Sequence, residues 1–338
     1  MLNANAHKNF TASGDREAEL LLENVLAETG SILSGTNLCV VLGGSYGRGD
    51  GGVRQDRENG ILYNDLDFFV FAEQNVSGAD KLLKEIAEKY EAELKVDIDF
   101  SRIMSVKDIK KNSNRLMMQE LKRGYHPVCG KDLLAEYLPE IPAENLPYSE
   151  ACRLLLNRGM GLLLAAEKIS ADSDETDFIL RNLCKAILGA ADALLIFRRQ
   201  YRWSMGERLE LFKSLEVPEK WKNLYSDAVE FKRAPNRTIK SDMAELLHSV
   251  RDMFAGCMEL VCGKNCEAIY LNCRERDELS LKNYLKYCVK SRSFAPLRSR
   301  FFAPAVASLL PELAEALQKI PDKSPEKSKL YQHWLIFN

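Results

Sequence analysis

The stretch that decides the fold is LCVVLGGSYGRG, residues 38–49, where an apolar run ends abruptly in two glycines and a serine. The run Leu38–Leu42 predicts a short strand, and the following Gly43, Gly44 and Ser45 predict a tight turn. Glycine lets the backbone approach a phosphate closely, so that backbone N–H groups and the Ser45 hydroxyl can hold the phosphate oxygens. The stretch therefore indicates an anion-binding turn directly after a strand.

Regular elements surround this turn. Residues Arg16–Leu33 carry apolar side chains at helical spacing, and Leu66–Ala72 is a second apolar run that predicts a strand. Ala79–Leu94 has helical periodicity, and Lys95–Phe100 alternates apolar with acidic residues as a strand does. The predicted order is helix, strand, strand, helix, strand.

Beyond Phe100 the pattern becomes mostly helical. A helix is predicted at Ser105–Lys122, a short strand at His126–Cys129 and a short helix at Lys131–Leu138, before a proline-containing linker at Pro139–Pro147. Further helices are predicted at Ala151–Ile169, Glu175–Tyr201, Pro218–Phe231, Ser241–Cys262 and Pro311–Ile320. The sequence thus predicts an α+β fold, with a small mixed β-sheet flanked by helices in residues 1–140 and an all-helical bundle domain in residues 148–338.

Length and composition set the class of protein. A chain of 338 residues with 46% hydrophobic and 28% charged residues is expected to form two globular domains. Its net charge of −2 gives no basic field of the kind that nucleic-acid-coating proteins carry, so a bound anion must be held by local groups. Residues Met1–Phe10 lack the apolar core of a secretory signal, and no stretch approaches the length of a membrane helix. We therefore expect a cytoplasmic protein with no membrane contact.

The nine cysteines are scattered along the chain and are expected to be reduced thiols. Their one cluster, formed by Cys257, Cys262, Cys266 and Cys273, contains no Cys-x-x-Cys pair and no histidine. Because structural zinc is usually held by ligands two to four residues apart, this spacing disfavours a zinc site.

Two pairs of aspartates stand on the predicted strands. Asp65 and Asp67 lie two positions apart at the start of a strand, so their carboxylates leave the same face of a sheet, and Asp97 and Asp99 repeat this spacing on the next strand. Neighbouring carboxylates repel one another, but Mg²⁺ between them, together with substrate phosphates, makes the arrangement favourable. If the two strands are neighbours, the acids and the glycine turn form a site for metal ions and a phosphorylated ligand.

This order of a Gly-Ser turn, an Asp-x-Asp strand and a further acid resembles the polymerase-beta-type nucleotidyltransferase superfamily. The resemblance covers Leu38–Phe100 and implies the nucleotidyltransferase fold, in which an appended helical domain commonly completes the substrate cleft. Kanamycin-type nucleotidyltransferases are similar in layout. By position in the superfamily's motif, Gly44 and Ser45 match its phosphate-binding Gly-Ser pair, and Asp65 and Asp67 match its paired metal ligands. Asp97 matches its third acid better than Asp99 does.

The resemblance implies a magnesium-dependent enzyme that moves a nucleoside monophosphate from a nucleoside triphosphate, ATP among the candidates, to a hydroxyl of a small-molecule acceptor. Pyrophosphate is released. Asp65, Asp67 and Asp97 would hold two Mg²⁺ ions, with Asp97 as the proton acceptor. Arg48 either pairs with a phosphate or is a solvated helix residue. The alternatives are transfer to a protein or nucleic acid and a non-catalytic nucleotide-sensing module, although the third acid favours catalysis.

Three further features have two interpretations each. Residues 51–64, with Arg54 and Arg57, make the connection between the turn and the acid pair longer than in compact members of the superfamily, and we expect a loop or small hairpin there. Arg181 and Lys185 lie one turn apart on an apolar helix and either face the triphosphate or are solvated. Residues 290–302 interleave basic and aromatic side chains, which fits the anchoring of a terminal segment better than the binding of single-stranded nucleic acid.

Overall fold

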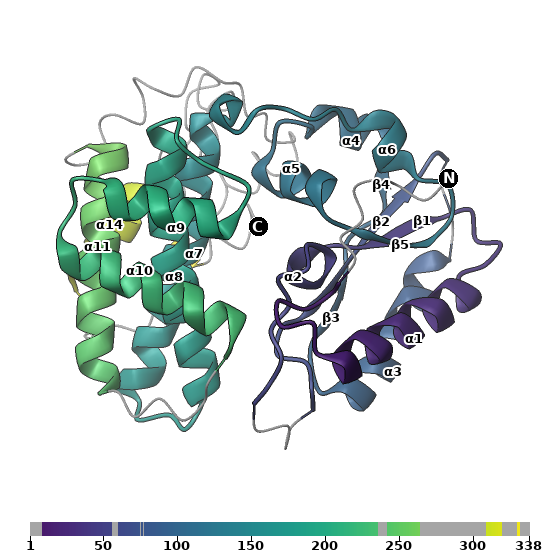
Figure 1. Ribbon diagram of the computed structural model, residues 1–338, viewed down its shortest axis with the longest axis horizontal. Coiled ribbons are helices and arrows are strands. Elements are labelled where there is room, and N and C mark those ends of the chain that lie inside the picture. Colours follow the sequence, from purple (N-terminus) through teal and green to yellow (C-terminus); the bar gives the residue numbers. More distant parts are fainter. Residues whose placement is uncertain are drawn as a thin grey trace. The chain divides into compact units, whose positions relative to one another are not determined.

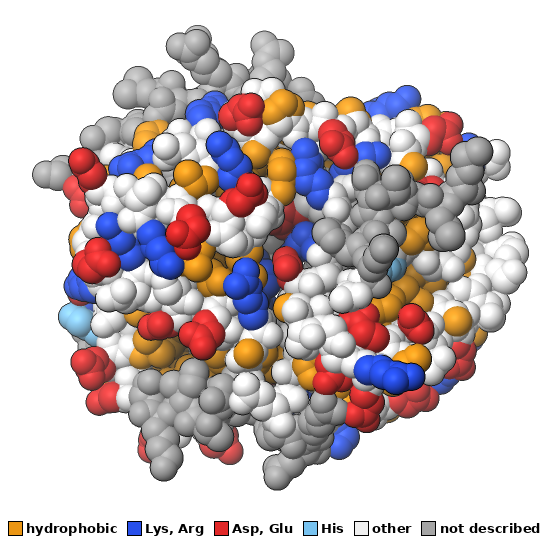
Figure 2. Space-filling model, viewed as in Figure 1, with side chains coloured by type: hydrophobic (Ala, Val, Ile, Leu, Met, Phe, Trp, Pro, Cys, Tyr) orange, Lys and Arg blue, Asp and Glu red, His pale blue; other side chains and the backbone are white. Residues whose placement is uncertain are grey.

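The computed structural model describes residues 9–55, 60–74, 76, 78–235, 242–263, 309–319 and 330–331 (Figure 1). Contacts divide the chain into two compact units, of which the first is Met1–Pro142 with Glu230–Asn236 and the second is Ala143–Val229 with Arg237–Asn338. The boundary after Pro142 falls within the predicted linker. Acidic and basic side chains are interspersed over the face seen in Figure 2, as a net charge of −2 leads one to expect.

A small mixed sheet forms the centre of the first unit, as the sequence predicts. Its strands run in the order β3-β2-β1-β5, with β4 paired to β2 as well. Strand β2 is parallel to β3 and β4, whereas β1 is antiparallel to both β2 and β5. The strands are β1 (Cys39–Leu42), β2 (Leu66–Ala72), β3 (Ile98–Phe100), β4 (Met104–Ser105) and β5 (His126–Cys129).

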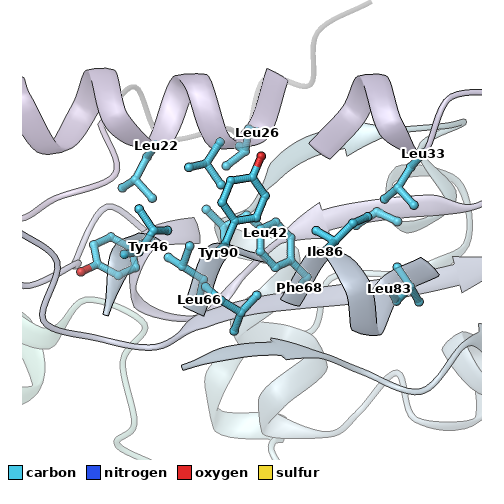
Figure 3. Close-up of a cluster of buried hydrophobic side chains, with 14 of the residues drawn as sticks. Leu22, Leu26, Leu33, Leu42, Tyr46, Leu66, Phe68, Leu83, Ile86 and Tyr90 are labelled. Carbon is cyan, nitrogen blue, oxygen red and sulfur yellow. The ribbon is translucent and has the colours of Figure 1, made fainter. Parts of the chain in front are cut away.

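One face of the sheet packs against helices α1 (Arg16–Ile32) and α3 (Ala79–Leu94) (Figure 1). Helix α1 begins at Asp15, whose carboxylate accepts a hydrogen bond from the Ala18 N–H at 3.0 Å and so caps the first turn. Alternate strand residues point to this face and meet the apolar stripes of both helices. Figure 3 shows this cluster, which includes Leu22, Leu26, Leu42, Tyr46, Leu66, Phe68, Leu83, Ile86 and Tyr90.

The opposite face packs against α4 (Val106–Lys111), α5 (Leu116–Arg123) and α6 (Leu133–Tyr137). Its buried side chains come from the intervening strand positions and these helices, and include Cys39, Val41, Phe71, Ile109, Met118, Leu121 and Leu134. The single helix predicted at Ser105–Lys122 is therefore wrong, because Ser105 belongs to β4 and Asn112 ends α4. Ser105 and Asp108 form a reciprocal cap at the start of α4, and Asn112 donates its side-chain amide to the Asp108 carbonyl at 2.9 Å, which favours a short helix there.

Strand β3 also begins later than the alternation at Lys95–Phe100 predicts. Lys95 has φ of 56° and closes α3 in the left-handed conformation, so the extended chain starts at Ile98. Between β1 and β2, the bridge from Val53 to Leu62 and the hydrogen bond from Arg54 N–H to the Ile61 carbonyl at 2.8 Å form a small hairpin. Of the loop and the small hairpin expected in residues 51–64, the described residues 51–55 and 60–64 form the paired arms of a hairpin. Arg57 lies outside the described residues.

The second unit is helical throughout its described residues. Helix α7 packs against α8, and α11 packs against both, with α14 against α7 and α11. The helices are α7 (Tyr148–Ser170), α8 (Thr176–Phe197), α9 (Met205–Ser214), α10 (Glu219–Arg233), α11 (Met243–Cys262) and α14 (Leu310–Gln318), preceded by a 3₁₀ turn at Ala143–Asn145. From Glu230 onward, α10 belongs to the first unit. Among the described helices, none combines the length and apolar character needed to cross a membrane.

Two predictions in this unit differ from the structure. The helix predicted at Glu175–Tyr201 ends at Phe197, because Arg199 adopts φ of 59° in the left-handed region. Helix α9 lacks a predicted counterpart, since only a few of its side chains are apolar and buried; its start is set by Ser204, whose hydroxyl accepts from the Glu207 N–H. The basic and aromatic segment 290–302, together with Cys266 and Cys273, lies outside the described residues.

Candidate functional site: an acidic strand face beside a glycine turn

The glycine turn leads from β1 into α2 (Gly44–Gly47), a single helical turn. Gly43 donates its N–H to the Asp67 carbonyl at 2.8 Å, so the turn is tied to the strand that carries the acid pair. A Cβ at Gly43 would lie 2.6 Å from Leu121 Cδ1 and 2.7 Å from the Phe69 ring, so a side chain there would require these two side chains to shift. The turn therefore lies close to the face of the sheet.

The Asp67 carboxylate lies against the backbone of the turn at Gly44. Its φ of +61° is strained for any residue with a side chain, and a Cβ there would lie 1.9 Å from Asp67 Oδ2. Ser45 follows immediately, half-buried in α2. The two halves of the predicted motif, which lie far apart in sequence, are thus in contact through Gly44 and Asp67.

The acids of β3 lie beside those of β2. Asp67 is in parallel register with Asp99, and the Asp97 carbonyl accepts a hydrogen bond from the Leu66 N–H at 2.9 Å, which continues the register to Asp65 and Asp97. The rings of Phe68 and Phe100 stack at 4.7 Å on the other face and hold this register. Because residues two apart share a face, all four carboxylates stand on the face opposite that stack. Asp65 and Asp67 are half-buried, whereas Asp97 and Asp99 are exposed.

The carboxylates of the four aspartates lie on one face of the sheet but do not form one close group. Within the described part of the chain, no three His, Cys, Asp or Glu side chains form a group that could hold a metal ion. Carboxylates repel one another when no cation lies between them, which favours separated orientations. The donor set itself, four hard oxygen ligands on adjacent strands, suits Mg²⁺. The carboxylate oxygens are thus of the kind that Mg²⁺ takes, although no three of the described carboxylates are gathered.

Tyr46, which the sequence analysis did not single out, connects the turn to the acid strand. Its ring is fully buried, and its hydroxyl donates to the Gly52 carbonyl at 2.8 Å. The same oxygen accepts from the N–H groups of Tyr63 at 3.0 Å and Asn64 at 3.2 Å. Burial raises the pKa of the Tyr46 phenol well above its usual range, so the hydroxyl stays protonated at neutral pH. No spacing rule reveals such a residue, because its partners lie across the inserted hairpin.

The arginines near the turn have carboxylate or backbone partners. Arg48 forms ion pairs with Asp50 at 3.9 Å and with Glu120 at 3.5 Å, so it is neither a fully solvated residue nor an uncommitted phosphate ligand. Arg54 is buried in the hairpin, where its Nε donates to the Leu62 carbonyl at 2.7 Å and its guanidinium lies 5.7 Å from the centre of the Tyr63 ring. Arg181 and Lys185 are half-buried on α8 in the second unit, and their two interpretations stay open.

A cavity of about 580 Å³ lies at the other end of β1, away from the turn. Its lining includes Leu38, Cys39 and Cys129, and its charged groups Glu73 and Lys131 form an ion pair at 3.0 Å. Since these charges already neutralise each other, the acidic strand face is the stronger candidate for phosphate chemistry. In comparisons with known proteins, no protein-family model matches the chain and no curated protein matches its sequence.

Proposed function

We propose that this protein is a magnesium-dependent nucleotidyltransferase that moves a nucleoside monophosphate from a nucleoside triphosphate to a hydroxyl of a small acceptor. The observation that carries the proposal is the contact of the Asp67 carboxylate with Gly44, beside a parallel strand that bears two more acids in register. The proposal includes the nucleotidyltransferase fold for the first unit and a helical bundle that supplies acceptor contacts in the second.

Each residue has a role in this proposal. Asp65, Asp67 and Asp97 hold two Mg²⁺ ions, which when bound supply Lewis-acid activation of the acceptor oxygen and neutralise charge on the pyrophosphate. The backbone of Gly44 and the hydroxyl of Ser45 grip phosphate oxygens, and Arg48 joins them if it leaves its carboxylate partners. The acceptor oxygen forms a bond to the α-phosphorus as the bond to the bridging oxygen of pyrophosphate breaks. Asp97 takes the proton of the acceptor hydroxyl.

A cytoplasmic location is part of the proposal. Free thiols, which suit a reducing compartment, are found at all the described cysteines: Cys39, Cys129, Cys152, Cys184, Cys257 and Cys262. Burial raises the pKa of the Cys39 thiol to about 11 and that of the Cys257 thiol to about 12, so both stay protonated and unreactive at neutral pH.

The test uses the full chain with each of the four nucleoside triphosphates, Mg²⁺ and a panel of hydroxylated small molecules. We expect pyrophosphate release that EDTA abolishes and that Asp67→Asn lowers by roughly 10³-fold, because a charge that stabilises the transition state is removed. Asp80→Asn is the matched control, since Asp80 is an exposed acid at the start of α3 in the same unit. Turnover that survives Asp67→Asn would contradict the proposal, and magnesium-independent binding without turnover would support the sensing alternative.

The third acid is assigned by comparing Asp97→Asn with Asp99→Asn. The sequence match favours Asp97, which continues the register beside Asp65, whereas Asp99 stands directly beside Asp67. We expect Asp97→Asn to lose about 10²-fold or more in kcat while Asp99→Asn loses less than about tenfold. The reverse order would move the role of third ligand to Asp99.

A further inference from the structure

A hairpin between the glycine turn and the acid strand separates the two halves of the proposed site in sequence. The hairpin is closed at its base by one buried oxygen, the Tyr46 hydroxyl, which bonds to Gly52 on the outgoing arm and to Tyr63 and Asn64 on the returning arm. Tyr46 directly follows Ser45, and Asn64 directly precedes Asp65. The same hydroxyl therefore contacts the chain immediately before the first acid.

Other contacts make this base rigid. The Asn64 side-chain carbonyl accepts from the Gly52 N–H at 2.8 Å, and the Tyr63 N–H also donates to the Gly52 carbonyl at 3.2 Å. The Tyr46 ring fills the space over Gly51, where an added Cβ would lie 2.0 Å from its Cδ1. Removal of this hydroxyl takes the acceptor from the Asn64 N–H and leaves the Tyr63 N–H and the Gly52 carbonyl only their longer bond to each other.

We infer that Tyr46 is a positioning residue that sets Asp65 relative to Ser45, so that the base of the hairpin, formed by Gly52, Tyr63 and Asn64, supports the metal and triphosphate site. The inference rests on the proposed function of that site. The Tyr46 hydroxyl touches neither substrate nor metal in this assignment. It acts by holding the chain at Asn64, one residue before Asp65, at a set distance from the turn that starts α2.

The experiment compares Tyr46→Phe with Tyr90→Phe in the full chain. Both rings belong to the same buried cluster (Figure 3), but the Tyr90 hydroxyl donates to Glu28 on α1 at 2.9 Å and not to a residue of the hairpin. Two quantities are measured for each variant: hydrogen exchange of the backbone amides in residues 60–67, and the Mg²⁺ concentration that half-saturates binding of the α,β-methylene analogues of the four nucleoside triphosphates.

In Tyr46→Phe we expect exchange at Asn64 to accelerate about tenfold, because its acceptor is lost, and exchange at Tyr63 to accelerate less, because the Gly52 carbonyl remains its acceptor. We also expect the half-saturating Mg²⁺ concentration to rise roughly tenfold, as happens when residues that orient metal ligands are removed. Tyr90→Phe should leave both quantities within about twofold of wild type, even if it lowers overall stability by a similar amount. A role in folding alone would move stability but not the Mg²⁺ requirement.

Unchanged exchange in Tyr46→Phe, or faster exchange with an unchanged Mg²⁺ requirement, overturns the inference. If Tyr46→Phe does not fold, Asn64→Ala replaces it. This variant weakens the base of the hairpin because it removes the acceptor of the Gly52 N–H. It is expected to change the exchange rate and the Mg²⁺ requirement in the same direction. A wild-type protein that binds none of the analogues at any Mg²⁺ concentration contradicts the proposed function instead. In that case, the amide exchange of Tyr46→Phe alone tests whether the Tyr46 hydroxyl holds the base of the hairpin against the turn.

Discussion

At the scale of single residues, Gly44 shows how a backbone conformation and a side-chain contact can demand the same residue. Its positive φ is strained for a residue with a side chain, and the Asp67 carboxylate occupies the space that a Cβ would need. The first requirement is met by glycines in many turns. The second is specific to a strand acid packed against a turn, which is why Gly44 connects the two motifs.

Gly44→Ala is expected to destabilise the protein more than a glycine replacement in open space. Gly35→Ala is the matched control, because Gly35 has φ of +80° and no atom within 4 Å of the place that a Cβ would take, so it should lose only the roughly 1–2 kcal/mol of the left-handed conformation. Gly44→Ala should lose about 1–3 kcal/mol beyond that, from overlap with Asp67. Urea denaturation measures both values.

A double replacement separates the two contributions. Adding Asp67→Ala to Gly44→Ala removes the overlapping carboxylate, so the combined loss should be smaller than the sum of the two single losses. Equal losses for Gly44→Ala and Gly35→Ala would mean that the contact with Asp67 carries no strain.

At the scale of elements, an ion pair and a hydrogen bond to one carboxylate connect helices α8, α9 and α10 of the second unit. Arg208 of α9 pairs with Asp192 of α8 at 3.0 Å, and the Tyr225 hydroxyl of α10 donates to the same carboxylate at 3.1 Å. Arg208 also donates to the carbonyls of Arg202 and Trp203, at the start of the loop into α9. This network accounts for the position of α9, a helix with few buried apolar side chains of its own.

Asp192→Ala is expected to lower the free energy of unfolding by about 3 kcal/mol, because the buried Arg208 loses its carboxylate partner. Glu210→Ala on α9 is the control, since its ion pair with Lys213 is exposed and should contribute less than about 0.5 kcal/mol. Denaturation followed by circular dichroism gives both numbers. A loss below about 1 kcal/mol for Asp192→Ala would show that the carbonyl partners of Arg208 suffice.

At the scale of the whole molecule, the first unit is built from two separate stretches of chain. Its second stretch is Glu230–Asn236, which begins within the end of α10, with the Phe231 ring edge-on to Tyr63 at 5.8 Å and Pro235 close to Gly52. Both contacts are made to residues at the base of the hairpin, Tyr63 and Gly52, which also bond to the Tyr46 hydroxyl. The hairpin is therefore supported from one side by the Gly-Ser turn and from the other by the end of α10.

Phe231→Ala is expected to loosen the hairpin in the full chain. Removing a buried Phe side chain costs about 3–5 kcal/mol in general, and here the lost contact is the one on Tyr63. Hydrogen exchange of residues 52–54 and 61–63 should accelerate. In Phe254→Ala, which empties a fully buried position in α11, exchange should instead accelerate within the second unit. Unchanged exchange in the hairpin of Phe231→Ala would exclude this support.

Much of the first unit could be predicted because its elements carry local signals. The bounds of β2, α3 and β5 match the apolar runs and helical periodicity, since the turn residues beside them interrupt each pattern clearly. The break between α4 and α5 and the existence of α9 were not predicted. In both cases a cap or a buried ion pair, rather than apolar periodicity, decides the structure. The return of Glu230–Asn236 to the first unit has no sequence signal, because it depends on which surfaces meet.

The sequence by itself determined strands β1, β2 and β5, the glycine turn and the alternating positions of the four acids, because each of these depends on residues a few positions apart. Only the tertiary structure decided that Asp67 stands beside Asp99, that its carboxylate fills the space over Gly44, and that the Tyr46 hydroxyl meets amides 17 and 18 residues further along the chain. The physical reason is that register and buried hydrogen bonds arise when distant segments share one packed core, and no local pattern records which groups will meet there.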